Sequence, residues 1–120
     1  MTASETIEKI SSVLADKKAL DIKTYDLRAK TNALVDFTLA ATATSPPHLK
    51  ALAGAVHREM RTAGATAART SGDHESAWIV LDYGDVMAHI FLADAREYYE
   101  IEKLWAPGKT APNPKSAVPQ

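Results

Sequence analysis

Apolar and polar positions follow two periods along this 120-residue chain, and the change of period divides it into helices and strands. Residues 5–17 have the helical period, with Ser4 as the expected N-cap, and their apolar positions are Ile7, Ile10, Val13 and Leu14. The stretch ALDIKTYDLR, which ends before Lys30, and a second stretch over about 34–42 are rich in β-branched residues. The first third of the chain therefore predicts one helix followed by two strands.

A second helix is predicted from TSPPHLKALAGAVHREMRTAG, which has signals for both of its ends. Ser45 is the expected N-cap, and Pro46 occupies the first helical position, where a missing N–H group costs no hydrogen bond. Gly64 lies where a residue with left-handed backbone ends a helix. The apolar stripe between these signals consists of Leu49, Leu52, Ala53, Val56 and Met60.

The last third predicts three strands and a helix. A short strand, ATAART, precedes the turn-rich SGDHES, and WIVLDYGDVMAHIF then reads as a hairpin. The segment ADAREYYEIEKLW predicts one continuous helix, which Asp94 and Glu97 open as a capping-box-like pair. The order α-β-β-α-β-β-β-α predicts an α/β fold, with a mixed five-stranded sheet covered by helices in one domain over 1–105. Residues 106–120 hold four of the six prolines and predict a disordered tail.

The hairpin is predicted to present two different faces. If Gly84-Asp85 is a two-residue turn, Trp78 pairs with Phe91 and Asp82 pairs with Met87. Because side chains alternate along a strand, one face is nearly all apolar: Ile79, Leu81, Tyr83, Val86, Ala88 and Ile90. The other face combines aromatic side chains with a carboxylate and an imidazole: Trp78, Val80, Asp82, Met87, His89 and Phe91.

Three interpretations of this second face compete. A helix covers it, and Asp82 and His89 satisfy each other or the backbone. Alternatively, His89 is a general base oriented by Asp82, although no motif places a Ser, Thr or Cys nucleophile nearby. In the third interpretation the face is a protein interface, because aromatic anchors with a few polar groups dominate the binding energy of such contacts.

Composition and charge restrict the functional classes. The absence of cysteine excludes disulfides and thiolate metal sites, and the histidine spacings do not resemble a zinc site. No targeting segment or apolar run of membrane-spanning length occurs, so we expect a cytoplasmic protein without a membrane partner. The net charge of −1 argues against binding nucleic acid mainly through phosphates. Residues 73–102, however, hold eight acidic side chains against Arg96 alone, an acidic field that would attract a basic partner.

The stretches ALDIKTYDLR, DFTLAATATS, HLKALAGAV, WIVLDYGDVMAHIF and REYYEIEKLW together resemble, in order and spacing, the ribosomal silencing factor family, also called Iojap. The resemblance covers about 19–105. It implies a nucleotidyltransferase-like fold without the catalytic residues of those enzymes, no cofactor and no metal. It also implies binding to the large ribosomal subunit through universal ribosomal protein fourteen. By occupying that site, such a protein blocks joining of the small subunit when nutrients are limiting.

Carried onto matching positions, the resemblance implies a set of partner-binding residues in the hairpin and the last helix: Trp78, Asp82, Tyr83, Asp85, His89, Phe91, Tyr98, Tyr99, Glu102 and Trp105. Three of them also have a purely structural explanation: Tyr83 suits the core, Asp85 suits a turn, and Tyr98 suits a buried helical stripe with Trp105. The free protein is a candidate homodimer through the same face. No sequence-specific reading of nucleic acid is expected.

The chain departs from the family pattern before the second helix, where ATGxSxRH is usual and this chain reads ATATSPPH. A contact made by the missing Arg is therefore absent or supplied elsewhere.

Three other functions are weighed against silencing: an assembly factor of the large subunit that uses the same site, an adaptor for another basic protein, and a nucleotidyltransferase. The last needs a Gly-Ser turn and an Asp-x-Asp metal pair, which the chain lacks.

Overall fold

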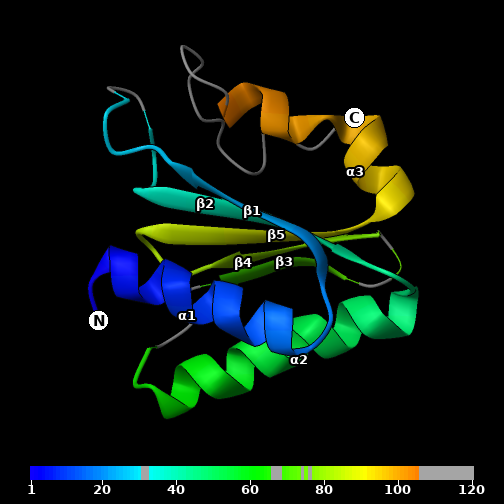
Figure 1. The fold of residues 1–120 in the computed structure, drawn as a ribbon, viewed down its shortest axis with the longest axis horizontal. Helices are drawn as coiled ribbons and strands as arrows, with labels where there is room; N and C mark the ends of the chain where they lie inside the picture. The colour runs from blue at the N-terminus through cyan, green and yellow to red at the C-terminus, as the bar shows by residue number, and fades with distance from the viewer. Residues whose placement is uncertain (31–32, 66–68, 74, 76, 106–120) are drawn as a thin grey trace.

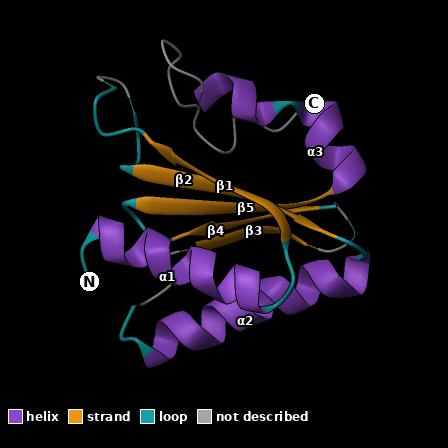
Figure 2. Cartoon of the chain, in the orientation of Figure 1, coloured by secondary structure: helices purple, strands orange, loops and turns teal. Residues whose placement is uncertain are grey.

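In the computed structural model, which describes residues 1–30, 33–65, 69–73, 75 and 77–105, helices lie against both faces of a five-stranded sheet (Figure 1). Helices α1 (Ala3–Asp16) and α2 (Pro46–Thr62) pack against one face. Helix α3 (Ala93–Tyr99) and the 3-10 helix η1 (Ile101–Trp105) lie on the other face (Figure 2). The predicted tail, 106–120, lies outside the described residues, so its disorder stays a prediction.

The sheet has the strand order β1-β2-β5-β4-β3. Its strands are β1 (Leu20–Asp26), β2 (Phe37–Ala43), β3 (Arg69–Asp73), β4 (Trp78–Asp82) and β5 (Val86–Leu92). The central strands β2 and β5 pair in parallel, and the other neighbours are antiparallel. Every residue of β2 is buried, because this strand has neighbours on both sides and helices over both faces. The predicted α/β class and mixed sheet are confirmed.

The ends of α2 agree with the prediction, whereas the start of α1 does not. The Ser45 side chain accepts a hydrogen bond from the His48 backbone N–H at 3.1 Å, and Gly64 has φ +87°. Helix α1 begins two residues earlier than predicted, because its N-cap is Thr2 rather than Ser4. Thr2 and Glu5 form a reciprocal capping box with bonds of 2.8 and 3.1 Å.

The hairpin register is confirmed. Trp78 pairs with Phe91 and Asp82 with Met87, and the Tyr83 N–H donates to the Val86 carbonyl at 2.8 Å across the Gly84-Asp85 turn. The apolar face packs against α1 and α2 in the larger core. The other face enters a second core, under α3 and η1.

Two predicted elements differ from the structure. Strand β3 covers Arg69–Asp73, so it continues past the predicted end at Thr70 and includes the Ser71-Gly72 pair that the sequence assigned to a turn; pairing with β4 decides this position. Residues 66–68 of the predicted strand lie outside the described residues. The single predicted last helix is divided at Glu100, which adopts a left-handed backbone with φ +50°. Asp94 does not cap it, because the N-cap is Leu92 and has no side-chain cap hydrogen bond.

Candidate partner-binding surface

The second face of the hairpin forms an aromatic cluster around an imidazole. Trp78 and His89 lie on neighbouring strands, and the indole Nε1–H donates to His89 Nδ1 at 3.1 Å. The Trp78 ring also stacks on Phe91, with centroids 5.1 Å apart. This arrangement follows from the strand register, which places Trp78 directly opposite Phe91 and diagonal to His89.

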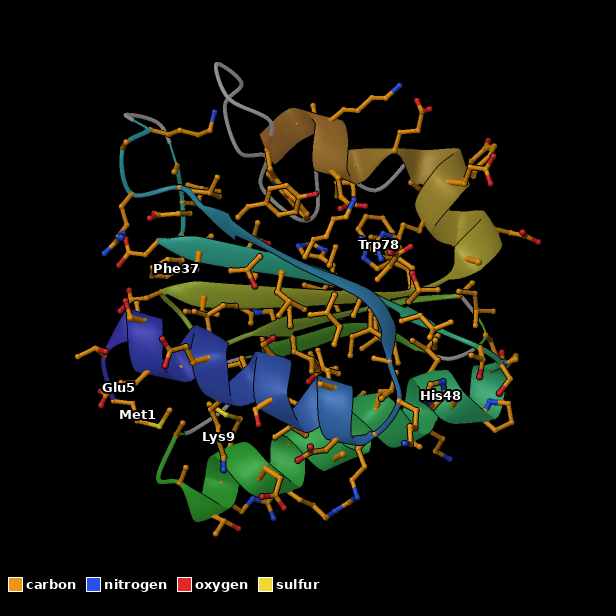
Figure 3. All side chains as sticks on the ribbon, viewed as in Figure 1. Met1, Glu5, Lys9, Phe37, His48 and Trp78 are labelled. Atoms are coloured by element: carbon orange, nitrogen blue, oxygen red, sulfur yellow. The ribbon has the colours of Figure 1, made fainter. Side chains whose placement is uncertain are left out.

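Tyr99 of α3 and Trp105 of η1 cover this cluster. The Tyr99 ring lies 5.1 Å from the Trp78 ring and the Trp105 ring lies 4.8 Å from the His89 ring, measured between centroids. Trp78 is consequently only 4% exposed and His89 2% exposed (Figure 3, where Trp78 is labelled between the sheet and α3). In this conformation the aromatic cluster supports the layer above it, and a partner would contact that layer.

The polar partners differ from those that the sequence suggested. His89 is satisfied by Trp78 rather than by Asp82, whose carboxylate accepts the Gly84 backbone N–H at 2.8 Å within the turn. Burial lowers the pKa of His89 to about 3, with the Glu102 charge opposing this shift, so the imidazole is neutral. A buried imidazole with this pKa does not fit the role of a general base near neutral pH.

A polar latch, formed by Arg96, Glu102 and Tyr25, fastens the C-terminal layer to the sheet. The Arg96 guanidinium donates to both Glu102 carboxylate oxygens, at 2.6 and 3.0 Å, and the Tyr25 hydroxyl donates to the same carboxylate. Arg96 also donates to the Asp21 carbonyl at 2.7 Å and to the Thr42 hydroxyl at 2.8 Å. The latch therefore joins α3, η1, β1 and β2.

The ionisation of the latch follows from these bonds. Burial opposes ionisation of Glu102, but the hydrogen bonds from Arg96 and Tyr25 outweigh it and hold the pKa of the carboxyl below its usual value. Burial and the bond to Glu102 raise the pKa of Tyr25 to about 12. Sequence reasoning missed Arg96 and Tyr25 as functional positions. The one available signal was that Arg96 is the single cation in an acidic stretch.

The hairpin turn lies at the other end of β5 from α3, so the structure separates its residues from the cluster. Asp85 is exposed, and its backbone carbonyl accepts the Asp36 N–H at 2.7 Å, at the start of β2. Tyr83 is half-buried against the larger core, and burial raises the pKa of its phenol. Tyr83 and Asp85 therefore lie far from Tyr98, and one partner could contact all three residues only by spanning the length of the sheet.

The outer surface of the C-terminal layer is acidic and carries one prominent aromatic side chain. Tyr98 is 77% exposed, which contradicts the alternative that it belongs to a buried stripe with Trp105, and its ring contacts Tyr99 edge-on at 5.1 Å. Tyr99 of α3, and Ile101 and Trp105 beyond the break at Glu100, face the sheet instead. The exposed carboxylates on this layer are Asp94, Glu97 and Glu100.

The cations of this layer do not cancel that charge. Arg96 is ion-paired with Glu102, and Lys103 is paired with Glu100 at 3.1 Å. Among the described residues, Asp94 and Glu97 therefore keep their negative charge without an ion pair.

Within the described part of the chain, no group of three or more His, Cys, Asp or Glu side chains could hold a metal ion. No described helix is long and apolar enough to cross a membrane. What this surface can do is bind a basic, partly apolar partner.

Comparison with known proteins identifies relatives along the whole chain. A model of the family "Ribosomal silencing factor during starvation" matches residues 1–120. Ribosomal silencing factors of Haemophilus influenzae and Chromobacterium violaceum are each 35% identical; the alignments cover 83% and 93% of this chain, and 97% and 98% of theirs. A crystal structure of a Chromobacterium violaceum protein, 35% identical, superposes with a TM-score of 0.82, over 94% of this chain and 92% of that one.

Proposed function

Because this chain belongs to the ribosomal silencing factor family, we propose that it binds the large ribosomal subunit through universal ribosomal protein fourteen. Membership of the family makes it a ribosome-associated protein that silences translation. The finer proposal is that the bound protein prevents the small subunit from joining when nutrients are limiting. This action needs occupancy and no turnover, cofactor or metal, and we place it in the cytoplasm.

The observation that carries the proposal is the acidic outer surface of α3, on which Tyr98 is exposed. Proteins of the ribosome are rich in basic residues, so an acidic platform favours their approach over that of RNA. An exposed aromatic ring anchors such a contact, since tyrosine is enriched among the residues that dominate binding energy. We therefore assign the direct contact to Tyr98 and the neighbouring carboxylates Asp94 and Glu97.

The other proposed partner-binding residues divide by their placement. We propose that Trp78, His89, Phe91 and Trp105 act as positioning residues, because they lie beneath the layer whose outer surface meets the partner. Tyr99 and Glu102 connect these buried residues to the outer surface. Tyr99 does so through its ring contacts and Glu102 through the latch. Asp82, Tyr83 and Asp85 remain candidates for a second contact at the hairpin turn.

The test is co-sedimentation of the chain with separated large subunits, separated small subunits and joined ribosomes. Wild type should sediment with free large subunits only. Tyr98→Ala should weaken this binding about tenfold or more, the effect of losing about 1.4 kcal/mol at a central aromatic contact. Leu34→Ala, which removes a similarly exposed apolar side chain away from this surface, is the matched control and should bind like wild type.

The outcomes separate the parts of the proposal. Wild type that sediments with neither subunit contradicts binding to the ribosome. If Tyr98→Ala binds large subunits as tightly as wild type does, the assignment of the contact to α3 is contradicted. Wild type that binds joined ribosomes as readily as free large subunits contradicts the steric block.

A second candidate function, assembly of the large subunit, is favoured by one relative. A mouse protein named "Mitochondrial assembly of ribosomal large subunit protein 1" is 26% identical over 82% of this chain and 44% of its own length. Sucrose-gradient profiles of cells that lack the gene distinguish the roles. An assembly factor leaves precursor particles of the large subunit during rapid growth. A silencing factor leaves excess joined ribosomes during starvation.

A further inference from the structure

Helix α2 carries a basic ridge, formed by Lys50, Arg58 and Arg61, on the side of the sheet opposite to α3 (Figure 1). All three side chains are exposed. At about 100° per residue they fall within about 80° of one another around the helix axis. The one carboxylate of the helix, Glu59, projects about 100° from Arg58 and about 160° from Arg61. The ridge is therefore a positive surface without an acidic neighbour on its own helix.

The cations of the C-terminal layer and those of α2 differ in their partners. Of the cations above the sheet, Arg96 and Lys103 are neutralised by Glu102 and Glu100. No carboxylate oxygen of the described residues lies within 4.0 Å of a ridge cation. The whole-chain net charge of −1 thus conceals an acidic outer surface on α3 and a positive stripe along α2, although helix α1, in the same layer as α2, carries Glu5, Glu8 and Asp16.

The Arg58 side chain lies along the surface of α2. Helical side chains lean toward the N-terminus, so Arg58 extends over Gly54, one turn earlier. A Cβ atom at position 54 would lie 3.3 Å from the Arg58 Nη1 atom. This placement keeps the guanidinium on the helix surface, over the turn that precedes Arg58. Near the end of the helix, His57 bonds to Thr70 of β3 at 3.0 Å, which fastens α2 to the sheet edge.

We infer that the α2 ridge binds the phosphate backbone of ribosomal RNA in the large subunit. This inference rests on the proposed function, which places the chain on a particle whose polyanion is RNA. Guanidinium groups bind phosphate oxygens in pairs, and lysine adds a point charge, so the ridge suits successive phosphates without reading base sequence. The protein contact through α3 and the RNA contact through α2 then lie on opposite sides of the sheet.

The test compares two triple variants that each lower the net charge by three: Lys50→Gln with Arg58→Gln and Arg61→Gln, and the control Lys17→Gln with Lys18→Gln and Lys23→Gln. The control lysines are exposed and lie outside α2. Affinity of each protein for purified large subunits is measured from about 50 to about 200 mM KCl. Circular dichroism confirms that each variant is folded.

We expect the ridge variant to bind large subunits about tenfold more weakly at the lower salt concentration. Its plot of log affinity against log salt concentration should be shallower than that of wild type by about 2 to 3, since each phosphate contact contributes about 0.9 to the slope. The control variant should keep the wild-type slope. All three proteins should bind isolated ribosomal protein fourteen equally, because α3 is unchanged.

Three results would overturn the inference: an unchanged slope for the ridge variant, an equal change in the control, or a loss of binding to isolated ribosomal protein fourteen. The last would mean that the ridge meets an acidic protein surface. If wild type does not bind large subunits, the proposed function fails, and fluorescence anisotropy with a short labelled RNA duplex decides the inference separately. Tighter duplex binding by wild type than by the ridge variant supports the ridge, and equal binding contradicts it.

Discussion

The buried imidazole of His89 makes the stability of the folded protein depend on pH. Its pKa is held near 3 in the folded protein, whereas an unfolded chain has a histidine pKa of about 6.5. Between these values the unfolded state binds a proton that the folded state does not. The free energy of unfolding therefore falls as the pH drops below about 6.5, and it continues to fall until about 3.

Replacing His89 tests this linkage. His89→Gln keeps a polar side chain beside the Trp78 indole but removes the titration. In urea unfolding followed by circular dichroism, wild type should lose about 2 kcal/mol more stability than the variant between pH 7.5 and pH 5. This range lies above most carboxyl pKa values, so carboxylates contribute little to the difference. Equal losses in the two proteins would contradict a buried, neutral His89.

Substitutions of Trp78 distinguish a residue that positions the binding surface from one that contacts the partner directly. Trp78→Ala should lower the free energy of unfolding by about 3 to 5 kcal/mol, the usual range for a buried large aromatic side chain. Trp78→Phe retains the ring packing but removes the donor to His89, and it should cost about 1 to 2 kcal/mol. Because the indole is covered, Trp78→Phe should bind large subunits like wild type. A folded Trp78→Phe variant with weak binding would instead make Trp78 a direct contact.

The C-terminal layer depends on its latch because α3 itself is weakly determined. This helix has seven residues, none of them fully buried, and its N-cap makes no side-chain hydrogen bond. It ends at Glu100 in a left-handed conformation that non-glycine residues seldom adopt. Buried anchors follow only in η1, where Ile101 and Trp105 enter the second core. The bonds among Arg96, Glu102 and Tyr25 therefore hold the exposed surface of α3 in place.

A double-mutant cycle on Glu102→Gln and Tyr25→Phe measures the latch. Glu102→Gln should destabilise the chain by about 1 to 3 kcal/mol, because Arg96 is then left partly buried without an opposite charge. The two changes should be non-additive by about 0.5 to 2 kcal/mol, since their side chains share a hydrogen bond. Glu100→Gln removes the exposed pair with Lys103 and should change stability by less than about 0.5 kcal/mol. Full additivity would show that the latch bond does not stabilise the layer.

The elements that sequence predicted well are those with local signals. The ends of α2 follow from Ser45, Pro46 and Gly64, and the hairpin register follows from a two-residue turn with alternating side chains. The Thr2 capping box also had a local signal, a Thr followed three residues later by Glu5, which the later Ser4 concealed. The break at Glu100 had none, because Tyr98, Ile101 and Trp105 have the spacing of an uninterrupted helical stripe. Tertiary packing of Ile101 and Trp105 on the sheet decides the break.

At the scale of the whole molecule, the sequence predicted which residues share the candidate site. It did not predict which of them are exposed. Sequence alternation placed Trp78, His89 and Phe91 on one face, and the structure confirms that they share it. Whether that face meets a partner or a helix depends on where the last 13 described residues fold, which no local pattern specifies. The acidic field was visible as a run of charges, whereas its separation from the α2 ridge required the three-layer arrangement.

The parallel pairing of β2 with β5 also affects how the chain can form during its own synthesis. Phe37 pairs with Val86, so the middle of the sheet joins residues that leave the ribosome far apart in time. Contacts between distant positions slow folding, because the loop between them must close first. Helix α2 and the preceding strands consequently lack their central neighbour until β5 has emerged. A nascent chain of this protein therefore cannot form its central parallel pair, or act on any ribosome, until β5 has been made and released from the one that makes it.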